Sequence, residues 1–283
     1  MRNIDILMSE ISESAIDSYL GEEVLSRVQK LYIFDALPST NAFLLEKGRE
    51  KAGAGSGALV ACLANQQTAG RGRNGRHWQS PENSNIYLSV GYQFENLDHA
   101  DLSCLSAACG VAICEWLDQL GVQAGLKWPN DVLVQNRKLA GILVEVKVSS
   151  SGIYVVIGIG LNVDMPAEAA TLIDQPWIDL RLALSPQDEV LERNRLVAGL
   201  LTTLTNVCKS YEESGFAGFV KGWDKYDLLT GKTVRVESGE SLNEAKVLGV
   251  NKDCSLSVLM NGGETTVYSA DIKIKLESEA GNS

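Results

Sequence analysis

The stretch GLKWPNDVLVQNRKLAGILVEVKVSSSGIYVVIGIGLNV (residues 125–163) decides the fold class. It contains apolar runs rich in Val and Ile, separated by short polar segments at residues 135–137 and 149–152. Connections this short join neighbouring antiparallel strands, whereas a crossover between parallel strands needs about a dozen residues or more. The stretch therefore predicts a β-meander, and the helical patterns on either side of it make the protein α+β.

The elements around this meander follow from the spacing of apolar residues. A strand running into the turn at Pro38 leaves Ser39 or Thr40 as the N-cap of a helix. Helices are expected at residues 41–51, 102–120 and 187–226, and strands at residues 32–36, 57–67 and 84–94. From Thr230 the pattern changes to five short alternating strands split by Gly and Asn, which predicts a small β-barrel.

These patterns divide the chain into parts. We expect a polar, helical N-terminal extension over residues 1–30 and a ligand-binding domain over residues 31–228. The small barrel follows over residues 229–277, and the polar tail at residues 278–283 is expected to fray.

The composition is that of an ordinary globular protein, with 45% hydrophobic and 22% charged residues in 283. A net charge of −11 argues against broad affinity for nucleic-acid phosphates, because such affinity comes from Lys and Arg. No apolar run reaches the length of about 18 residues that a membrane helix needs. The N-terminus also lacks the basic start and apolar core of a signal peptide, so we expect a cytoplasmic protein that binds no membrane.

The six cysteines lie mostly inside apolar runs, with no C-x-x-C pair and only two histidines to complete a zinc set. Free cysteine behaves as a small hydrophobic residue. We therefore expect buried thiols, with neither a zinc site nor a disulfide.

The segment QTAGRGRNGRHWQSP (residues 67–81) gathers positive charge within an acidic protein. Its glycines allow backbone N–H groups to approach an anion, and its arginines carry planar donor forks suited to phosphate or carboxylate. It is not a Walker A loop, because G-x-x-x-x-G-K-[ST] does not occur in the chain. The segment predicts a site for a small anionic ligand, and the alternative is a solvated basic turn.

Four shorter motifs accompany this loop. In KWPND (residues 127–131) a lysine, an amide and a carboxylate meet at a strand end, where they could hold phosphates with Mg²⁺ or form only a tight turn. In RKLAGILVE (residues 137–145) Lys138 stands at the mouth of a strand and Gly141 leaves room against the backbone. STN (residues 39–41) offers hydroxyls at a helix N-terminus, or simple capping. In GIGLNV (residues 158–163) Asn162 could serve a ligand or satisfy backbone groups.

Together and in this order, the five motifs resemble the biotin–protein ligases, or biotin–[acetyl-CoA-carboxylase] ligases, from about residue 38 to residue 163. The resemblance implies a class II synthetase-like catalytic domain with a mixed, largely antiparallel sheet, followed by an SH3-like barrel. It also implies the activity: biotin is activated with MgATP to biotinyl-5′-AMP and pyrophosphate, and is then passed to the ε-amine of one lysine on a biotin carboxyl carrier protein, an acetyl-CoA carboxylase subunit.

The resemblance assigns roles residue by residue. Lys138, Arg73 and Asp131 would be the catalytic residues, and Asn130 would contact Mg²⁺ through ATP. The residues implied to bind biotin are Ser39, Thr40, Asn41, Gln67, Arg71, Gly72, Arg73, Lys138 and Gly141. Those implied to bind ATP are Arg73, Arg76, Trp78, Lys127, Asn130, Asp131, Lys138 and Asn162.

Two further expectations follow from comparing this sequence with the family. Some members carry an N-terminal winged helix that binds DNA, but the residues before Ser39 show neither basic clustering nor the helices of such a module. We therefore expect a ligase of the type without DNA-binding function, with homodimerisation as the family allows. The alternatives are a lipoate–protein ligase of the same fold, which would lack the GRGRNGRHW and KWPND motifs, and a non-catalytic biotin sensor.

Overall fold

The computed structural model of the chain describes residues 6–48, 58–95, 97, 101–149, 152–184, 191–238, 241–268 and 273–276. Some of the expected features lie wholly or partly outside these ranges. They are the end of the helix expected at residues 41–51, the middle of the turn at residues 149–152, the start of the helix expected at residues 187–226, and the tail at residues 278–283.

A seven-stranded sheet forms the centre of the larger part, with strand order β2-β3-β4-β8-β7-β6-β5. Its strands are β2 (Val28–Leu37), β3 (Leu59–Gln67), β4 (Ile86–Phe94), β5 (Gly125–Lys127), β6 (Asp131–Val134), β7 (Arg137–Ser149) and β8 (Gly152–Leu161). β2 and β3 are parallel, and every other neighbouring pair is antiparallel. The predicted meander from β5 to β8 and the mixed, largely antiparallel sheet are confirmed.

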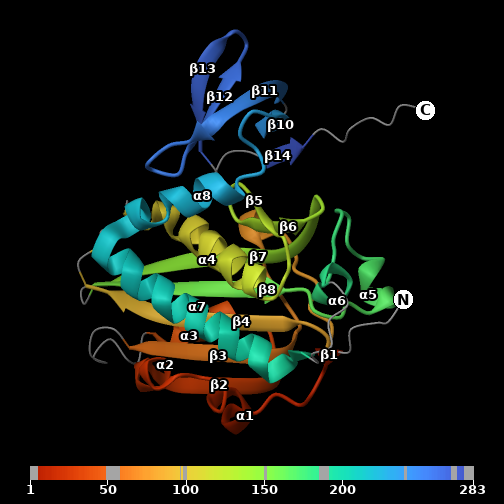
Figure 1. The fold of residues 1–283 in the computed structure, drawn as a ribbon, viewed down its shortest axis with the longest axis vertical. Coiled ribbons are helices and arrows are strands. Elements are labelled where there is room, and N and C mark those ends of the chain that lie inside the picture. The colour runs from red at the N-terminus through yellow and green to blue at the C-terminus, as the bar shows by residue number, and fades with distance from the viewer. Residues whose placement is uncertain are drawn as a thin grey trace.

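Helices cover both faces of this sheet (Figure 1). The alternation of side chains along β8 separates the two faces: Val156 packs with Leu44 of α3 (Thr40–Lys47), whereas Val155 and Ile157 belong to the main core. That core lies under α4 (Leu105–Gln119) and α7 (Arg193–Ser214), which contact each other and the sheet. α3 therefore lies on the face opposite the two long helices.

The N-terminal segment packs against this same core. α1 (Glu13–Asp17) and α2 (Glu22–Arg27) contact α7, and each contributes a buried residue, Ile16 and Val24. β1 (Ile6–Leu7) pairs in parallel with β9 (Leu191–Glu192), directly before α7. The remaining short helices are α5 (Ala167–Ala170), α6 (Leu180–Ala183), α8 (Val220–Tyr226) and the 3₁₀ turns η1 (Arg73–Gly75), η2 (Asp101–Cys104) and η3 (Gly215–Gly218). The division of the chain into domains stays a prediction.

The C-terminal strands form a separate antiparallel sheet of five, in the order β13-β12-β11-β10-β14 (Figure 1). They are β10 (Thr233–Ser238), β11 (Ser241–Val250), β12 (Leu256–Met260), β13 (Gly263–Val267) and β14 (Lys273–Leu276). Val234, Val247 and Val258 are fully buried between them. This sheet is consistent with the expected SH3-like barrel and is called the barrel below.

The barrel is tied to the KWPND turn and to the start of α4. The Leu228 N–H donates to the Leu126 carbonyl at 2.9 Å, and Trp128 Nε1 donates to the Cys254 carbonyl at 2.7 Å. Cys254 also forms a disulfide with Cys104, which precedes α4. The expectation that no disulfide occurs is therefore wrong for this pair, because the fold brings together two cysteines 150 residues apart that no sequence spacing connects. The thiols of Cys62, Cys109, Cys114 and Cys208 are free and buried, as expected.

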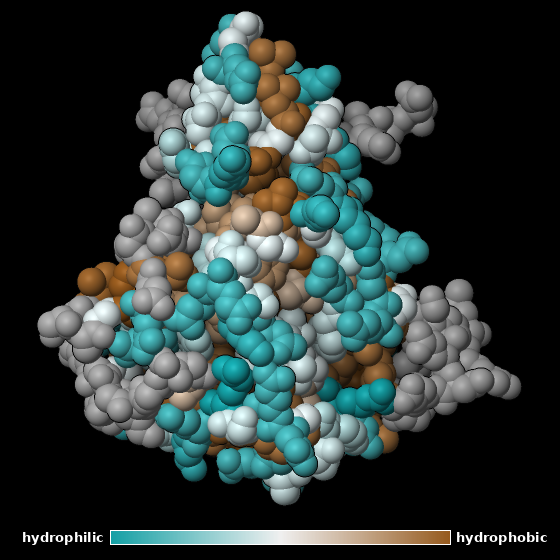
Figure 2. Space-filling view, turned by 60° about the vertical axis from the view of Figure 1, so that its left-hand side comes forward, coloured by the Kyte–Doolittle hydropathy of each residue, from teal (hydrophilic) through white to brown (hydrophobic). Residues whose placement is uncertain are grey.

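The face of the molecule in Figure 2 mixes hydrophilic and hydrophobic residues, with hydrophobic groups at the top, on the barrel, and also lower down. Exposed apolar side chains of this kind are ordinary on a globular protein. Within the part of the chain that the structure describes, no helix is long and apolar enough to cross a membrane.

Candidate functional site

One cavity of about 1230 Å³ opens between the sheet, the arginine-rich loop, the KWPND turn and the barrel. Every residue that the sequence singled out for ligand binding lines it. These are Ser39, Thr40, Asn41, Gln67, Arg71, Gly72, Arg73, Arg76, Trp78, Lys127, Asn130, Asp131, Lys138, Gly141 and Asn162. The motifs therefore converge in space, although whether each residue has its assigned role stays a prediction.

Uncharged polar groups form one side of the cavity, which we call the neutral half: Ser39, Thr40, Asn41 and Gln67, with Ser89 buried behind them. Ser39 is the N-cap of α3, and its Oγ accepts from the Ala42 N–H at 3.4 Å. Ser89 Oγ lies 2.6 Å from both Thr40 Oγ1 and Asn41 Oδ1. Gln67 Oε1 accepts from the Thr40 N–H at 3.0 Å. These groups are fixed to one another before any ligand arrives.

Asn41 is packed against the sheet as well as hydrogen-bonded. Its Nδ2 donates to the Leu143 carbonyl at 3.2 Å and to Glu145 Oε2 at 2.8 Å. The residue beneath it is Gly158, where an added Cβ would lie 2.2 Å from Asn41 Oδ1. Only glycine therefore fits at this position of β8 while Asn41 keeps its place.

A second group of lining residues, which we call the charged half, carries charged side chains: Arg73, Lys127, Asp131 and Lys138. Lys138 Nζ lies 2.7 Å from Asp131 Oδ1, in an ion pair whose side chains are 13% and 18% exposed. The same Nζ lies 5.2 Å from the centroid of the Trp78 ring, at cation–π distance. Burial lowers the pKa of the Arg73 guanidinium, and the negative charge of Asp131 acts in the opposite direction. Arg73 keeps its charge at neutral pH because the pKa of an arginine is far above that range.

The arginine-rich loop has a folded structure. Arg71 and His77 form an antiparallel bridge, the Gly72 N–H donates to the Arg76 carbonyl at 2.7 Å, and the Trp78 N–H donates to the Gly70 carbonyl at 2.9 Å. Gly75 turns the chain with φ +71°. The loop is thus closed at its base, with Arg71 on one stem and Trp78 on the other.

Trp78 lies over glycines of the sheet. A Cβ at Gly160 would lie 2.4 Å from its indole, and a Cβ at Gly141 would lie 3.0 Å from it. The indole Nε1 is buried, and no hydrogen-bond partner for it occurs within the described part of the chain. The glycines of β7 and β8 therefore leave room for this ring to lie against the sheet.

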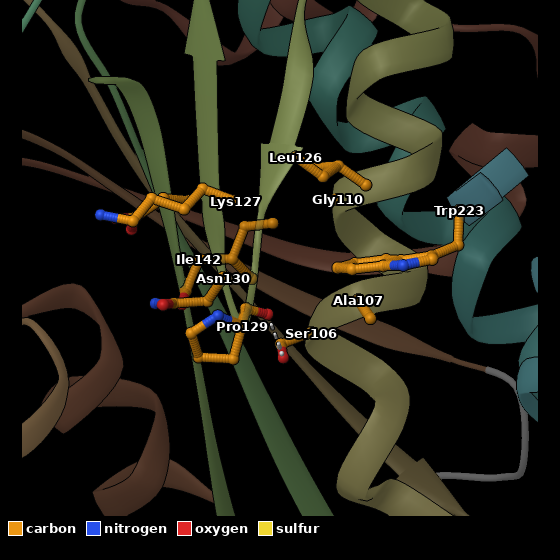
Figure 3. Close-up of a pocket in the computed structure, with 10 residues that line it drawn as sticks. Ser106, Ala107, Gly110, Leu126, Lys127, Pro129, Asn130, Ile142 and Trp223 are labelled. Carbon is orange, nitrogen blue, oxygen red and sulfur yellow. Dashed lines mark hydrogen bonds between the residues drawn. The ribbon is translucent and has the colours of Figure 1, made fainter. Parts of the chain in front are cut away.

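The KWPND turn has the predicted geometry: Lys127 ends β5 and Asp131 begins β6. The Trp128–Pro129 peptide bond between them is cis. The back of the turn closes on α4, where a narrow crevice contains Ser106, Gly110 and the Trp223 indole (Figure 3). Figure 3 shows the Lys127 side chain pointing away from Trp223 and α4. The turn thus directs its lysine toward the open side.

Asn130 and Asn162 use their amide groups on the backbone. Asn130 Nδ2 donates to the Ile142 carbonyl at 2.7 Å. Asn162 Nδ2 donates to the Lys138 carbonyl at 3.2 Å and to the Ile178 carbonyl at 3.1 Å. Asn162 is only 3% exposed. This agrees with the alternative that Asn162 satisfies backbone groups, and it also fixes the strand end that carries Lys138.

Sequence reasoning missed several residues of the site. Ser89 and Glu145 lie on predicted strands behind the lining, where a lone polar residue gives no signal of its partners. The missed residues that line the cavity itself include Leu172, Ile173, Asp174, Gln175, Pro176, Trp177 and, from the barrel side, Lys232 and Thr233. The barrel residues could not be placed there, because the docking of one part of a chain on another leaves no local pattern.

The donors available to a metal ion are few. Among the described residues, no group of three or more His, Cys, Asp or Glu side chains is arranged to hold a metal. Asp131 and the amide oxygen of Asn130 are hard oxygen donors of the kind that Mg²⁺ shares with substrate phosphates. They fit a Mg²⁺ ion that arrives with a nucleotide and do not fit an all-protein metal cage.

Comparison with known proteins agrees with this site. The model of the "Biotin/lipoate A/B protein ligase family" matches residues 33–162. The bifunctional ligase/repressor BirA of Escherichia coli is 34% identical over 249 residues, covering 84% of this chain and 74% of BirA. The biotin–[acetyl-CoA-carboxylase] ligase of Mycobacterium tuberculosis is also 34% identical, covering 82% of this chain and 84% of that protein.

A solved structure shares the fold: a mutant of the Aquifex aeolicus biotin protein ligase, in complex with biotin, has a TM-score of 0.68 and 26% identity. It matches 88% of this chain and 99% of its own. Fold and site thus define a protein of the biotin and lipoate ligase class. Within that class, biotin ligases and lipoate ligases are distinguished by the 34% sequence identity to BirA and to the Mycobacterium tuberculosis ligase. The chain belongs to the biotin–protein ligase family.

Proposed function

We propose that the two halves of the cavity divide the work of an ATP-dependent biotin–protein ligase. The enzyme joins biotin and ATP to biotinyl-5′-AMP, with release of pyrophosphate, and then transfers biotin to a lysine ε-amine of a protein. The observation that carries the proposal is that a neutral, prearranged polar wall and a cationic wall face a single cavity. Biotin has an uncharged ring system and a carboxylate, and ATP brings the phosphates.

The neutral half suits the ureido ring of biotin. An uncharged ligand with both donors and acceptors is recognised by fixed hydroxyl and amide groups, since leaving such groups unpaired would cost free energy. Ser39 and Thr40 present hydroxyls at the N-terminus of α3, with Gln67 beside them. Asn41 already donates to two acceptors and acts chiefly by shaping the wall.

The charged half suits the reacting groups. In the first step a carboxylate oxygen of biotin attacks the α-phosphorus of ATP, and the bond from that phosphorus to the pyrophosphate oxygen breaks. Two anions must be brought together in line, so Lys138 and Arg73 offset their repulsion and stabilise the charge that develops on the phosphoryl oxygens. The adenine end is assigned to Trp78, whose ring lies against the sheet glycines and lines the cavity.

Asp131 has two roles in this proposal. Before binding it holds Lys138 at 2.7 Å. Once the nucleotide is bound, Asp131 and Asn130 would hold Mg²⁺ together with the phosphates, and Lys127 would contact them from the end of β5. The ion, when bound, neutralises phosphate charge.

In the second step the lysine amine of the acceptor attacks the acyl carbon of the adenylate, the bond to AMP breaks, and the amine loses a proton. The adenylate reacts readily with water, so it must be covered until the acceptor arrives. The arginine-rich loop, closed at its base and bearing Arg71, Gly72, Arg73 and Arg76 on the cavity, is assigned this covering role.

The acceptor that the proposal names is a biotin carboxyl carrier domain. One experiment tests the whole: the purified chain is incubated with biotin, MgATP and an unmodified carrier domain, and the carrier is weighed by mass spectrometry. The expected gain is one biotinyl group per carrier, absent without ATP. Lipoate in place of biotin is the control, and lipoyl transfer at an equal rate would overturn the assignment. The expected homodimer, the absence of nucleic-acid binding and the cytoplasmic location remain predictions.

A further inference from the structure

Glu145 is an unexpected residue to find beside a site for anions. It lies on β7 between the neutral half and the arginine-rich loop, and its side chain is 24% exposed. Biotin carboxylate and ATP both carry negative charge, so a carboxylate near them is unfavourable unless it serves another group. Of the residues described around the cavity, Asn41 and Arg71 belong to the lining and Glu145 stands behind both.

A single oxygen of Glu145 joins these two lining residues. Oε2 accepts from Asn41 Nδ2 at 2.8 Å and from Arg71 Nη2 at 3.0 Å. Asn41 belongs to α3 and Arg71 to the loop, so this oxygen connects the floor of the neutral half to one stem of the loop. Hydrogen bonds to an ionised acceptor are among the stronger ones in proteins.

The other stem of the loop is reached through the neutral half. Asn41 contacts Ser89, Ser89 contacts Thr40, and Thr40 donates to Gln67. Gln67 Nε2 then donates to Ser80 Oγ at 3.1 Å, and Ser80 Oγ donates to the Trp78 carbonyl at 3.1 Å. The network therefore begins at Arg71 and ends at Trp78, the two residues that flank the base of the loop.

From this geometry we propose that Glu145 is a positioning residue that makes the placement of the arginine-rich loop depend on an intact biotin-ring pocket. It holds Arg71 as the fixed stem of the loop, so that the arginine assigned to the reacting anions is Arg73 and not Arg71. The inference deepens the proposed function and rests on it. Arg71 and Arg73 are thereby given different tasks at the biotin end of the site, where the family resemblance assigns both of them to biotin.

The test compares biotin binding with ATP binding in Glu145→Gln. The substitution keeps an oxygen for Asn41 but removes the charge that holds Arg71. Calorimetry with biotin alone should show roughly tenfold weaker binding, because a charge-assisted hydrogen bond is lost. The KM for ATP should change less than the affinity for biotin, because Lys127, Asp131 and Lys138 lie outside the loop. Biotinyl-AMP should escape faster when it is chased with unlabelled biotin.

A double-mutant cycle separates positioning from general damage. If Glu145 acts through Arg71, then Arg71→Gln should reproduce the loss of biotin affinity, and the double variant should be no weaker than either single variant. Arg71 is 44% exposed, so its variant provides the test even if Glu145→Gln does not fold. Glu23→Gln, which breaks an ion pair of the same 3.0 Å length with Lys209, is the matched control and should bind biotin normally.

The outcomes distinguish this proposal from the function on which it rests. Parental biotin affinity in Glu145→Gln or in Arg71→Gln would overturn the positioning role, as would single effects that multiply in the double variant. A parent protein that forms no biotinyl-AMP would instead overturn the proposed function, and one that binds no biotin would overturn both.

Discussion

The two halves of the cavity differ in the interactions that hold their side chains in place. In the neutral half the polar groups are bonded to one another and to the backbone, and Ser39, Thr40, Asn41 and Ser89 are nearly or fully buried. In the charged half two cations lie near one carboxylate, Asp131: Lys138 from a strand and Arg73 from the loop. In the function proposed above, the prearranged neutral wall would select the ligand, whereas cations that can exchange a carboxylate for a phosphate would provide the chemistry.

The largest effect is expected from Lys138→Ala, which removes the central cation of the charged half. Adenylate formation should fall by about 100- to 1000-fold, as for the loss of one donor that stabilises a developing charge. Nucleotide binding should fall much less, since Lys127 and Arg73 remain. ATP–pyrophosphate exchange measures the first quantity and calorimetry the second. Equal exchange in variant and parent would contradict the role, and Lys209→Ala, from an exposed ion pair, is the control.

A pair of glycine substitutions on β8 tests whether the halves are independent. In Gly158→Ala the new Cβ meets Asn41 Oδ1, and in Gly160→Ala it meets the Trp78 indole. Overpacking of this kind costs about 1–3 kcal/mol. Because the displaced side chain lines the cavity, the affinity of each variant for one ligand should fall roughly tenfold or more. Gly158→Ala should weaken biotin and spare ATP, while Gly160→Ala should do the reverse. Similar losses of both ligands in both variants would show that the division is wrong.

Arg73→Gly should slow formation of the intermediate and also weaken its retention, and the loss of retention is the effect that separates Arg73 from Lys138. The loop would keep its closed base, which depends on backbone bonds and on Arg71, but would lose the cation that faces Asp131 and the phosphates. Biotinyl-AMP should escape about tenfold faster, by analogy with the loss of a charged hydrogen bond. Biotinylation of lysines on a bystander protein measures the escape. Unchanged retention would contradict the covering role, and Arg73→Lys should lie between variant and parent.

The meander and the converging motifs could be predicted because they depend on local patterns. The β5–β8 meander followed from strand lengths and short turns, and an N-cap of α3 at Ser39 or Thr40 followed from the residue types, with the structure giving Ser39. The list of lining residues followed from the resemblance of the five motifs to the biotin–protein ligases, because each motif alone also had a purely structural interpretation. All of them meet in one cavity.

Contacts between distant segments could not be predicted. Glu145 looks like the polar member of a strand, and only the folded sheet brings it to Asn41 and Arg71. Cys104 and Cys254 each look like buried hydrophobic residues, and their disulfide depends on where the barrel docks. Lys232 reaches the cavity for the same reason. Such contacts come from tertiary packing, which hydrophobic periodicity does not encode.

The smallest effect is expected at the junction that supports the charged half. Trp128→Phe removes the hydrogen bond to the Cys254 carbonyl, which is worth about 0.5–1.5 kcal/mol. The disulfide of Cys254 holds the same contact, so the KM for ATP should rise only by a small factor in the single variant. In Trp128→Phe combined with Cys254→Ser both ties are lost, and the KM for ATP should rise further than the two single effects predict. Biotin affinity should stay constant throughout, because the neutral half makes no use of the barrel. A double variant with the parental KM for ATP would show that the charged half does not depend on the barrel. A loss of biotin affinity in parallel with the rise in the KM for ATP would show that the barrel supports both halves of the cavity.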